Sequence, residues 1–270
     1  MGAQYDISVD SASFHRIVSR LTEDQTPRVW SLLVTVFGEL AQDKGAQISG
    51  LMLRHMREHI GIKPEAMRVA LHRLRKDGWI ENERTGRTSA HHLTDWGRTQ
   101  SAAASPRIYS RDATATRAWL IVSDPSQSQP QGRACGVWVS SNLRIATTPP
   151  KDTASFVAVL DDAAQIPAWM KNKVCALQTR AASKSFFETL KQVREELAGA
   201  DALSTIEHAV LRVLLVHAWR RIILKAPELP DCVFPQDWYG PQCRALMADL
   251  FDQFPKLHLS DLQDAVENAS

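Results

Sequence analysis

A basic segment between positions 63 and 87 carries the side chains best suited to bind a partner. Residues 64–76 have helical spacing, with one apolar stripe made of Met67, Ala70, Leu71 and Leu74. A rotation of about 100° per residue puts four residues nearly opposite that stripe: Glu65, Val69, His72 and Lys76. Arg68 and Arg75 flank this outer face on one side and Arg73 on the other. The pattern favours a helix that presents cations and one aliphatic group to a polyanion.

The chemistry of these side chains matches the edges of DNA bases. An arginine can bond to O6 and N7 of guanine, and valine methyls can touch the thymine methyl group. We expect Arg68, Val69 and His72 to contact bases, with Glu65 as a further candidate. Phosphate contacts supply affinity but little sequence information. The residues suited to them are Lys63, Arg73, Arg75, Lys76 and, at the tip of a following hairpin, Arg84 and Arg87.

Metal and catalytic sites are not indicated. His91 and His92 are adjacent in a predicted strand, so their rings point to opposite faces. His55 and His59 have helical i, i+4 spacing, but no carboxylate or cysteine nearby completes a ligand set. The chain has neither a glycine-rich phosphate loop nor a nucleophile elbow. We therefore expect a protein that is not an enzyme and holds no cofactor or metal.

The elements that would position the basic helix follow one another closely. A first helix is predicted over 27–42, a second from a Ser49 cap to Gly61, and a third from Pro64 to Gly78. Residues 79–83 and 88–93 predict two strands joined by a turn at 84–87. Thr94 and Asp95 can cap another helix, which the small residues 101–106 would end. This order predicts a winged helix-turn-helix.

The rest of the chain predicts two further domains. Residues 118–122, 137–140 and 155–160 read as short strands, and helices return from about residue 185. The segment 203–225 is apolar on every face, which is typical of a buried central helix. We expect an α+β, multidomain protein with a winged helix-turn-helix at 1–108, a small α/β domain at 109–182 and a helical domain at 183–270.

Composition and charge agree with a cytoplasmic DNA-binding protein. The 270 residues are 44% hydrophobic, with no secretory signal and no apolar run long enough to cross a membrane. Residues 54–111 carry twelve bases and six acids, whereas 226–270 carry two bases and eight acids. The four cysteines stand far apart and are expected to be buried free thiols.

Two stretches carry a family resemblance. Residues 34–109, with LLVTVFGEL, IKPEAMRVALHRLRKDGWIENERTGRTSAHHLTDWGR and RIY, resemble the N-terminal domain of the phenylacetic-acid degradation repressor (PaaX-type) family. The run LLVHAWRRIILKAPELPDCVFPQDWYGPQCRALMADLF, from Leu214 to Phe251, is similar to that family's helical signature. The resemblance implies a homodimeric repressor of an aromatic-acid catabolic operon. It further implies a palindromic DNA operator and an aryl-acyl-CoA effector that releases the repressor from the operator.

The chain departs from the family pattern in two places. Lys63-Pro64 replaces the polar cap that usually begins the recognition helix. The resemblance also implies a ferredoxin-like, Cas2-like middle domain, but residues 124–136 form a polar loop where its first helix is expected. The middle domain is accordingly expected to be trimmed.

An effector site has one candidate set of residues: His217, Trp219, Arg220, Arg221 and Trp238. Arginines on an apolar helix face need partners. Either Arg220 and Arg221 pair with carboxylates such as Asp237 or Asp249, or they line a pocket for an acidic aromatic ligand.

Two other functions stay open on the sequence. A Cas2-like domain could act as a metal-dependent nuclease through Asp124, although that residue reads more simply as part of a turn. A winged helix can also serve as a protein-interaction module.

Overall fold

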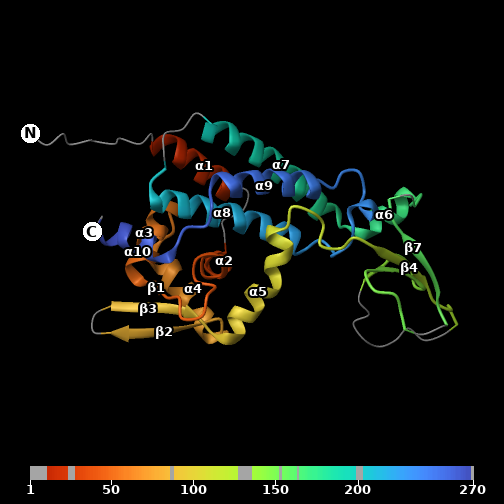
Figure 1. The fold of residues 1–270 in the computed structure, drawn as a ribbon, viewed down its shortest axis with the longest axis horizontal. Coiled ribbons are helices and arrows are strands. Elements are labelled where there is room, and N and C mark those ends of the chain that lie inside the picture. The colour runs from red at the N-terminus through yellow and green to blue at the C-terminus, as the bar shows by residue number, and fades with distance from the viewer. Residues whose placement is uncertain are drawn as a thin grey trace, which may run out of the picture. The chain divides into compact units, whose positions relative to one another are not determined.

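The computed structural model describes residues 11–23, 28–85, 88–126, 136–151, 154–162, 164–198 and 203–268. Within these ranges it contains ten α-helices and two antiparallel sheets, so the predicted α+β class is confirmed (Figure 1). The chain forms two compact units. Unit 1 comprises residues 1–105, 189–218 and 249–270, and unit 2 comprises residues 106–188 and 219–248.

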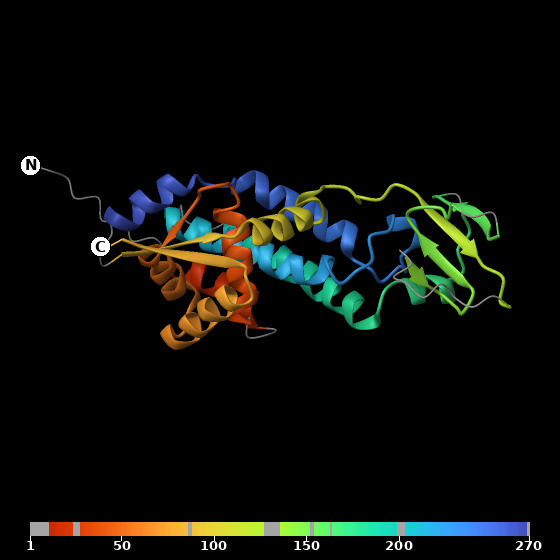
Figure 2. The same cartoon turned by 90° about the horizontal axis from the view of Figure 1, so that it is seen from below.

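Unit 1 begins with helices and a small sheet. Its elements in order are α1 (Ser11–Glu23), α2 (Val29–Leu40), β1 (Ile48–Ser49), α3 (Gly50–Ile60), α4 (Pro64–Lys76), β2 (Ile80–Thr85) and β3 (Thr88–Leu93). The sheet order is β1-β3-β2, with Ile48 opposite His91 and Ile80 opposite Leu93. The β2–β3 hairpin lies next to α4, as Figures 1 and 2 show. All the predicted elements of this region are present, whereas α1 and β1 were not predicted.

The junction between α3 and α4 follows from four residues. Ser49 Oγ accepts a hydrogen bond from the Met52 amide at 3.1 Å and so caps α3. Gly61 ends that helix with φ of 77°, a left-handed conformation that glycine adopts without steric cost. Lys63 is extended and makes no side-chain cap, and Pro64 opens α4 with its fixed φ. The predictions for Ser49, Gly61 and the Lys63-Pro64 start are confirmed.

Helix α5 (Asp95–Tyr109) is longer than the sequence predicted. Thr94 Oγ1 caps it by accepting from the Gly97 amide at 2.9 Å, and the same hydroxyl donates to Gly78 O at 2.6 Å. The expectation that residues 101–106 end this helix is wrong. Alanine has the highest helix propensity, so the small-residue stretch continues the helix instead.

The core of unit 1 is built on apolar helix faces. Leu33 and Phe37 of α2 are buried, as are Met67 and Leu74 of α4. Burial of each such side chain contributes about 1.5–3 kcal/mol. In α8 (Thr205–Ile223) every residue from Ile206 to His217 is buried except His208, which is half-buried, so the predicted buried helix is confirmed.

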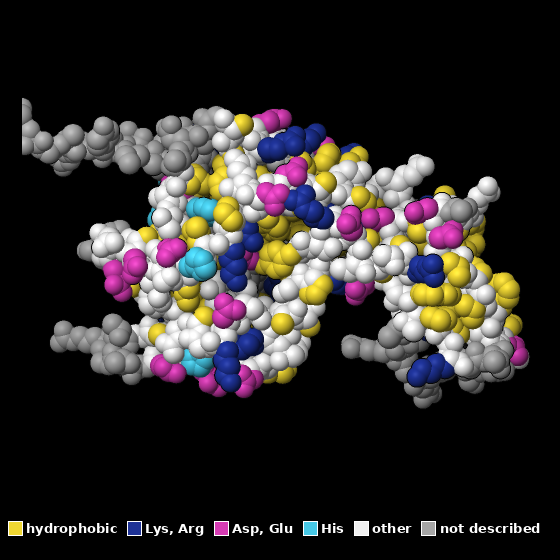
Figure 3. Space-filling view, viewed as in Figure 1, with side chains coloured by type: hydrophobic (Ala, Val, Ile, Leu, Met, Phe, Trp, Pro, Cys, Tyr) yellow, Lys and Arg dark blue, Asp and Glu magenta, His cyan; other side chains and the backbone are white. Residues whose placement is uncertain are grey.

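Unit 2 contains the second sheet. Strands β4 (Ala118–Val122), β5 (Val137–Trp138), β6 (Leu143–Ala146) and β7 (Phe156–Leu160) pair antiparallel in the order β5-β6-β4-β7. Hydrophobic side chains gather on this sheet, where Phe156 and Val159 are exposed (Figure 3). Three of these strands were predicted, and β6 was not.

Helices complete the chain. They are α6 (Ala168–Val174), α7 (Leu177–Ala198), α9 (Gly240–Gln253) and α10 (Leu259–Asn268), with a short 3₁₀ turn at Asp231–Val233. Residues of α7, α8 and α9 belong to both units, and α10 belongs to unit 1. The compact units follow bounds other than residues 108 and 182. The predicted division into three domains stays a prediction. Most of the polar loop expected at 124–136 cannot be compared, because residues 127–135 lie outside the described residues.

Two predictions about the whole chain can be compared with these elements. No helix in the described ranges is long and apolar enough to cross a membrane. Cys175 and Cys243 are buried free thiols, Cys232 is a half-buried free thiol, and Cys135 lies outside the described residues.

Candidate nucleic-acid interface

The outer face of α4, which we define as Glu65, Val69, His72 and Lys76 with the flanking Arg68, Arg73 and Arg75, is open to solvent. Met67, Ala70 and Leu74 are buried on the opposite side, where α4 packs on α2. Val69 is 65% exposed and supplies an aliphatic group to this face. Lys63, just before the helix, is exposed as well. The predicted division of this helix into a buried packing side and a solvent-exposed side is confirmed.

Arg75 joins the helix to the hairpin. Its Nη1 donates a hydrogen bond to Asn82 Oδ1 of β2 at 3.1 Å. Such a contact restricts the angle between α4 and the strands that follow it. Asn82 was not singled out in the sequence, because a polar residue in a predicted strand carries no sign of its partner.

Arg73 lies on the opposite flank of the outer face and has two neighbours. Its guanidinium carbon stands 4.7 Å from the centroid of the Trp30 ring on α2, a cation–π arrangement. Its Nε is also 3.4 Å from Asp77 Oδ2, one helical turn further along. These contacts orient the side chain while leaving it half exposed. Trp30 is a second positioning residue that spacing alone did not indicate.

The hairpin tip is only partly described. The backbone of Arg84 belongs to β2, but its side chain and the whole of Arg87 lie outside the described residues. Their contact with a nucleic acid stays a prediction.

The adjacent histidines of β3 occupy different environments, as their alternation in a strand requires. His91 is buried, and burial, then the nearby Arg75, then His92, lower its pKa. His92 is half-buried, with Nε2 3.4 Å from Glu81 Oε2. No group of three or more His, Cys, Asp or Glu residues suited to a metal occurs in the part of the chain that the structure describes.

The turn before α4 is held by Arg57. Its Nη1 donates to the Ile62 carbonyl at 3.2 Å, and its Nη2 contacts Glu58 Oε1 at 2.7 Å. On the same helix, His59 Nδ1 lies 2.9 Å from the His55 carbonyl oxygen. Of these contacts, the one from Arg57 to the Ile62 carbonyl ties α3 to the turn before α4.

The residues suggested for an effector site are largely enclosed. In unit 1, His217 is buried and its Nδ1 lies 3.1 Å from Thr35 Oγ1. In unit 2, Trp219 is 0% exposed, stacks on Phe186 and donates from Nε1 to the Ile108 carbonyl. That environment leaves its ring no face for a ligand, so the expectation for Trp219 is corrected: it is a core residue.

Trp238 is similarly packed, because its ring stacks on Phe234 with centroids 5.1 Å apart. The cavity beside it has a volume of ≈ 20 Å³, room for about one water molecule. Burial lowers the pKa of Arg220, with an opposing effect from Tyr109. The suggested pairing of Arg220 or Arg221 with Asp237 is wrong, because Asp237 binds Arg180.

Asp124, the candidate nuclease residue, forms a turn. Its Oδ1 accepts from the Ser126 amide at 2.9 Å and from the Ser126 hydroxyl at 2.7 Å. Both contacts are exposed and local, as an Asx turn requires. The simpler expectation for this residue is confirmed.

Family comparisons agree with the two stretches that carry the resemblance. The model described as PaaX-like protein matches residues 28–97, and the model described as PaaX-like protein C-terminal domain matches residues 177–258. The first match contains α2 to the hairpin, including all of the outer face of α4. Together the two matches cover more than half of the chain.

One relative and one solved structure are similar to this chain over most of its length. The "Transcriptional repressor PaaX" of Escherichia coli (strain K12) is 25% identical over 271 residues, covering 88% of this chain and 84% of that protein. A solved structure, the "Uncharacterized protein Rv0674 from Mycobacterium tuberculosis", covers 88% of this chain and 97% of its own at 16% identity, with a TM-score of 0.47. The family models and the Escherichia coli relative together place the chain in the PaaX-like protein family.

Proposed function

We propose that the chain is a transcriptional repressor that binds double-stranded operator DNA through a winged helix-turn-helix formed by α3, α4 and the β2–β3 hairpin. The observation that carries the proposal is the outer face of α4, where five cations between residues 63 and 76 surround an exposed Val69 and His72. The similarity to the Escherichia coli repressor supports the same function.

In this proposal α4 enters the major groove with its outer face toward the bases. Arg68, Val69 and His72 read base edges, with Glu65 as a further contact. Lys63, Arg73, Arg75 and Lys76 bind phosphates, so that binding weakens steeply as salt rises. The hairpin acts as the wing, and Arg84 and Arg87 at its tip reach the backbone or the minor groove.

The finer features of the proposal come from the family resemblance. We infer a cytoplasmic homodimer on a palindromic site in an aromatic-acid catabolic operon, without enzymatic activity. An aryl-acyl-CoA would release the dimer from DNA by binding more tightly to the conformation that cannot bind DNA. The coupling free energy between effector binding and DNA binding would be about 1–3 kcal/mol. Arg220 and Arg221, half-buried near the end of α8, are the candidates to hold its acidic groups. Calorimetric titration of phenylacetyl-CoA against the wild type and Arg220→Ala tests that assignment.

Selection of bound fragments from the genome tests the DNA proposal directly. We expect the wild type to retain a palindromic fragment over random DNA at moderate salt, and the double variant Arg68→Ala/His72→Ala to lose that preference. Arg194→Ala, which removes an exposed arginine of α7, is the matched control and should retain it. Incubation with magnesium should leave the fragment intact.

Two results would reject the proposal. Cleavage of the fragment would favour a nuclease. Absence of any preferred fragment would favour a winged helix that binds protein.

A further inference from the structure

Unit 2 contains an open pocket with a volume of ≈ 470 Å³, within the range of small-molecule sites. It lies among α6, the start of α7 and the loop before α9. The lining residues are Ile166, Ala168, Lys171, Asn172, Arg180, Pro235, Gln236 and Asp237. One part of the wall is therefore aliphatic, from Ile166, Ala168 and Pro235, and the rest is polar.

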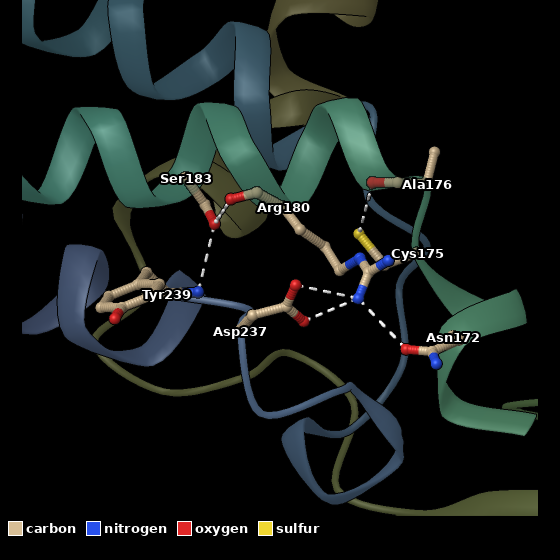
Figure 4. Close-up of polar contacts among 7 residues, drawn as sticks. All are labelled: Asn172, Cys175, Ala176, Arg180, Ser183, Asp237 and Tyr239. Carbon is tan, nitrogen blue, oxygen red and sulfur yellow. Dashed lines mark hydrogen bonds and ion pairs between the residues drawn. The ribbon is translucent and has the colours of Figure 1, made fainter. Parts of the chain in front are cut away.

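The polar wall is organised around Arg180, whose side chain is 12% exposed. Its Nη1 donates to both oxygens of Asp237, at 2.7 and 3.0 Å, and to Asn172 Oδ1 at 3.1 Å (Figure 4). The charge of Asp237 is thus balanced by Arg180. Because Asn172 Oδ1 accepts this hydrogen bond, its Nδ2 group is left as a donor.

Cys175 is a further neighbour of Arg180. Figure 4 shows the Cys175 thiol close to the guanidinium of Arg180. Burial raises the pKa of Cys175 to about 11, while Arg180 lowers it and Asp237 raises it further. The thiol is therefore uncharged at neutral pH and adds no negative charge to the wall.

Lys171 is the unbalanced charge of the pocket. It is half-buried on α6, and it forms no ion pair with any carboxylate that the structure describes. With Arg180 and Asp237 balancing each other, the lining carries one net positive charge beside a donor amide and an aliphatic wall. An ammonium group next to apolar surface favours an anion with a compact apolar group.

We propose that this pocket binds a small organic anion, with its carboxylate or phosphate on Lys171 Nζ and Asn172 Nδ2 and its apolar part against Ile166, Ala168 and Pro235. Arg180 is a positioning residue here, since it fixes Asn172 and neutralises Asp237. Anion binding at this pocket requires no DNA and stands apart from the function of α4.

Calorimetric titration of the full chain with sodium benzoate tests the site, with benzamide as the uncharged counterpart. We expect saturable binding of benzoate and none of benzamide. Lys171→Met keeps the aliphatic stem and removes the charge, and should weaken benzoate binding by about tenfold or more. Lys173→Met is the matched control, because Lys173 is an exposed lysine of the same helix outside the pocket. It should bind benzoate as the wild type does.

Inorganic phosphate and butyrate separate the possible sources of the anion. Stronger binding of phosphate, again lost in Lys171→Met, assigns the pocket to phosphate-bearing ligands, and stronger binding of butyrate or benzoate assigns it to carboxylic acids. Circular dichroism and the thermal midpoint verify that each variant is folded. The proposal is overturned if none of the anions binds saturably, or if Lys171→Met binds them as tightly as Lys173→Met does.

Discussion

Arg75 of α4 donates a hydrogen bond to Asn82 of β2 at 3.1 Å, so a flanking residue of the outer face also holds the hairpin. The same guanidinium contributes to the lowered pKa of the buried His91 on the neighbouring strand. The orientation of the helix and the electrostatics of the sheet are therefore connected through one side chain.

Removal of Asn82 should loosen this connection. We expect Asn82→Ala to lower the free energy of unfolding by about 0.5–1.5 kcal/mol, the usual net contribution of one hydrogen bond. Asn82→Asp keeps an acceptor for Arg75 and should recover most of that loss. Urea denaturation of the three proteins provides the measurement, and equal stability of Asn82→Ala and the wild type would show that the contact contributes nothing.

Val69 should recognise a thymine methyl group if α4 lies in the major groove. Replacement of single thymines in the selected fragment by deoxyuracil removes that methyl. At one position we expect wild-type affinity to fall about fourfold, the equivalent of one buried methylene group. Val69→Ala should not distinguish the two bases there. Fluorescence anisotropy measures both, and an unchanged wild-type affinity at every position would exclude the contact.

Arg68 and Lys76 should make different kinds of contact with DNA, the first with a base and the second with a phosphate. Arg68→Ala is expected to cost about 1–3 kcal/mol on the preferred fragment and to relax specificity at one base pair. Lys76→Ala should weaken all fragments alike and reduce the salt dependence of log K by about one unit. Titrations over a range of salt concentrations distinguish them. If both variants lost affinity uniformly, Arg68 would be reassigned to phosphate binding.

Stability should fall on acidification because of His91. Its pKa is lowered in the folded state, so between the folded pKa and 6.5 the unfolded chain binds more protons. The free energy of unfolding therefore decreases as pH falls below about 6.5, and His91 imposes no cost above that pH. His91→Gln should show a shallower decline between pH 7.5 and 5.5 than the wild type. Urea denaturation at each pH provides the measurement, and equal slopes for the two proteins would exclude His91 as the cause.

Local signals explain which parts of the fold were predictable. Ser49 acts through a local side-chain cap, and Gly61 and Pro64 act through their own backbone geometry, so the sequence located α3 and α4 closely. The apolar spacing of Phe14, Ile17 and Val18 in α1 is too short a pattern to predict a helix by itself. The strand β1 is only two residues long, and its pairing with β3 depends on a partner more than forty residues away.

The two candidate sites also differ in whether local sequence signals could indicate them. The outer face of α4 comes from one helix, so its residues could be chosen by rotation about a single axis. Arg180 and Asp237 are fifty-seven positions apart, and nothing in either neighbourhood indicates that they meet. Trp219 is a residue type that often contacts ligands, yet its indole is buried in the core of unit 2.

Gly97 shows how a position without a side chain can govern the shape of unit 1. A Cβ atom there would stand 2.3 Å from the Trp79 carbonyl oxygen, a backbone atom that cannot turn aside. Even alanine would force the first turn of α5 away from the base of the hairpin and strain both hydrogen bonds of Thr94. An affinity screen confined to the exposed arginines would miss this position. Substitutions at Gly97 should impair binding as severely as loss of a base contact, by displacing the whole surface that presents those arginines.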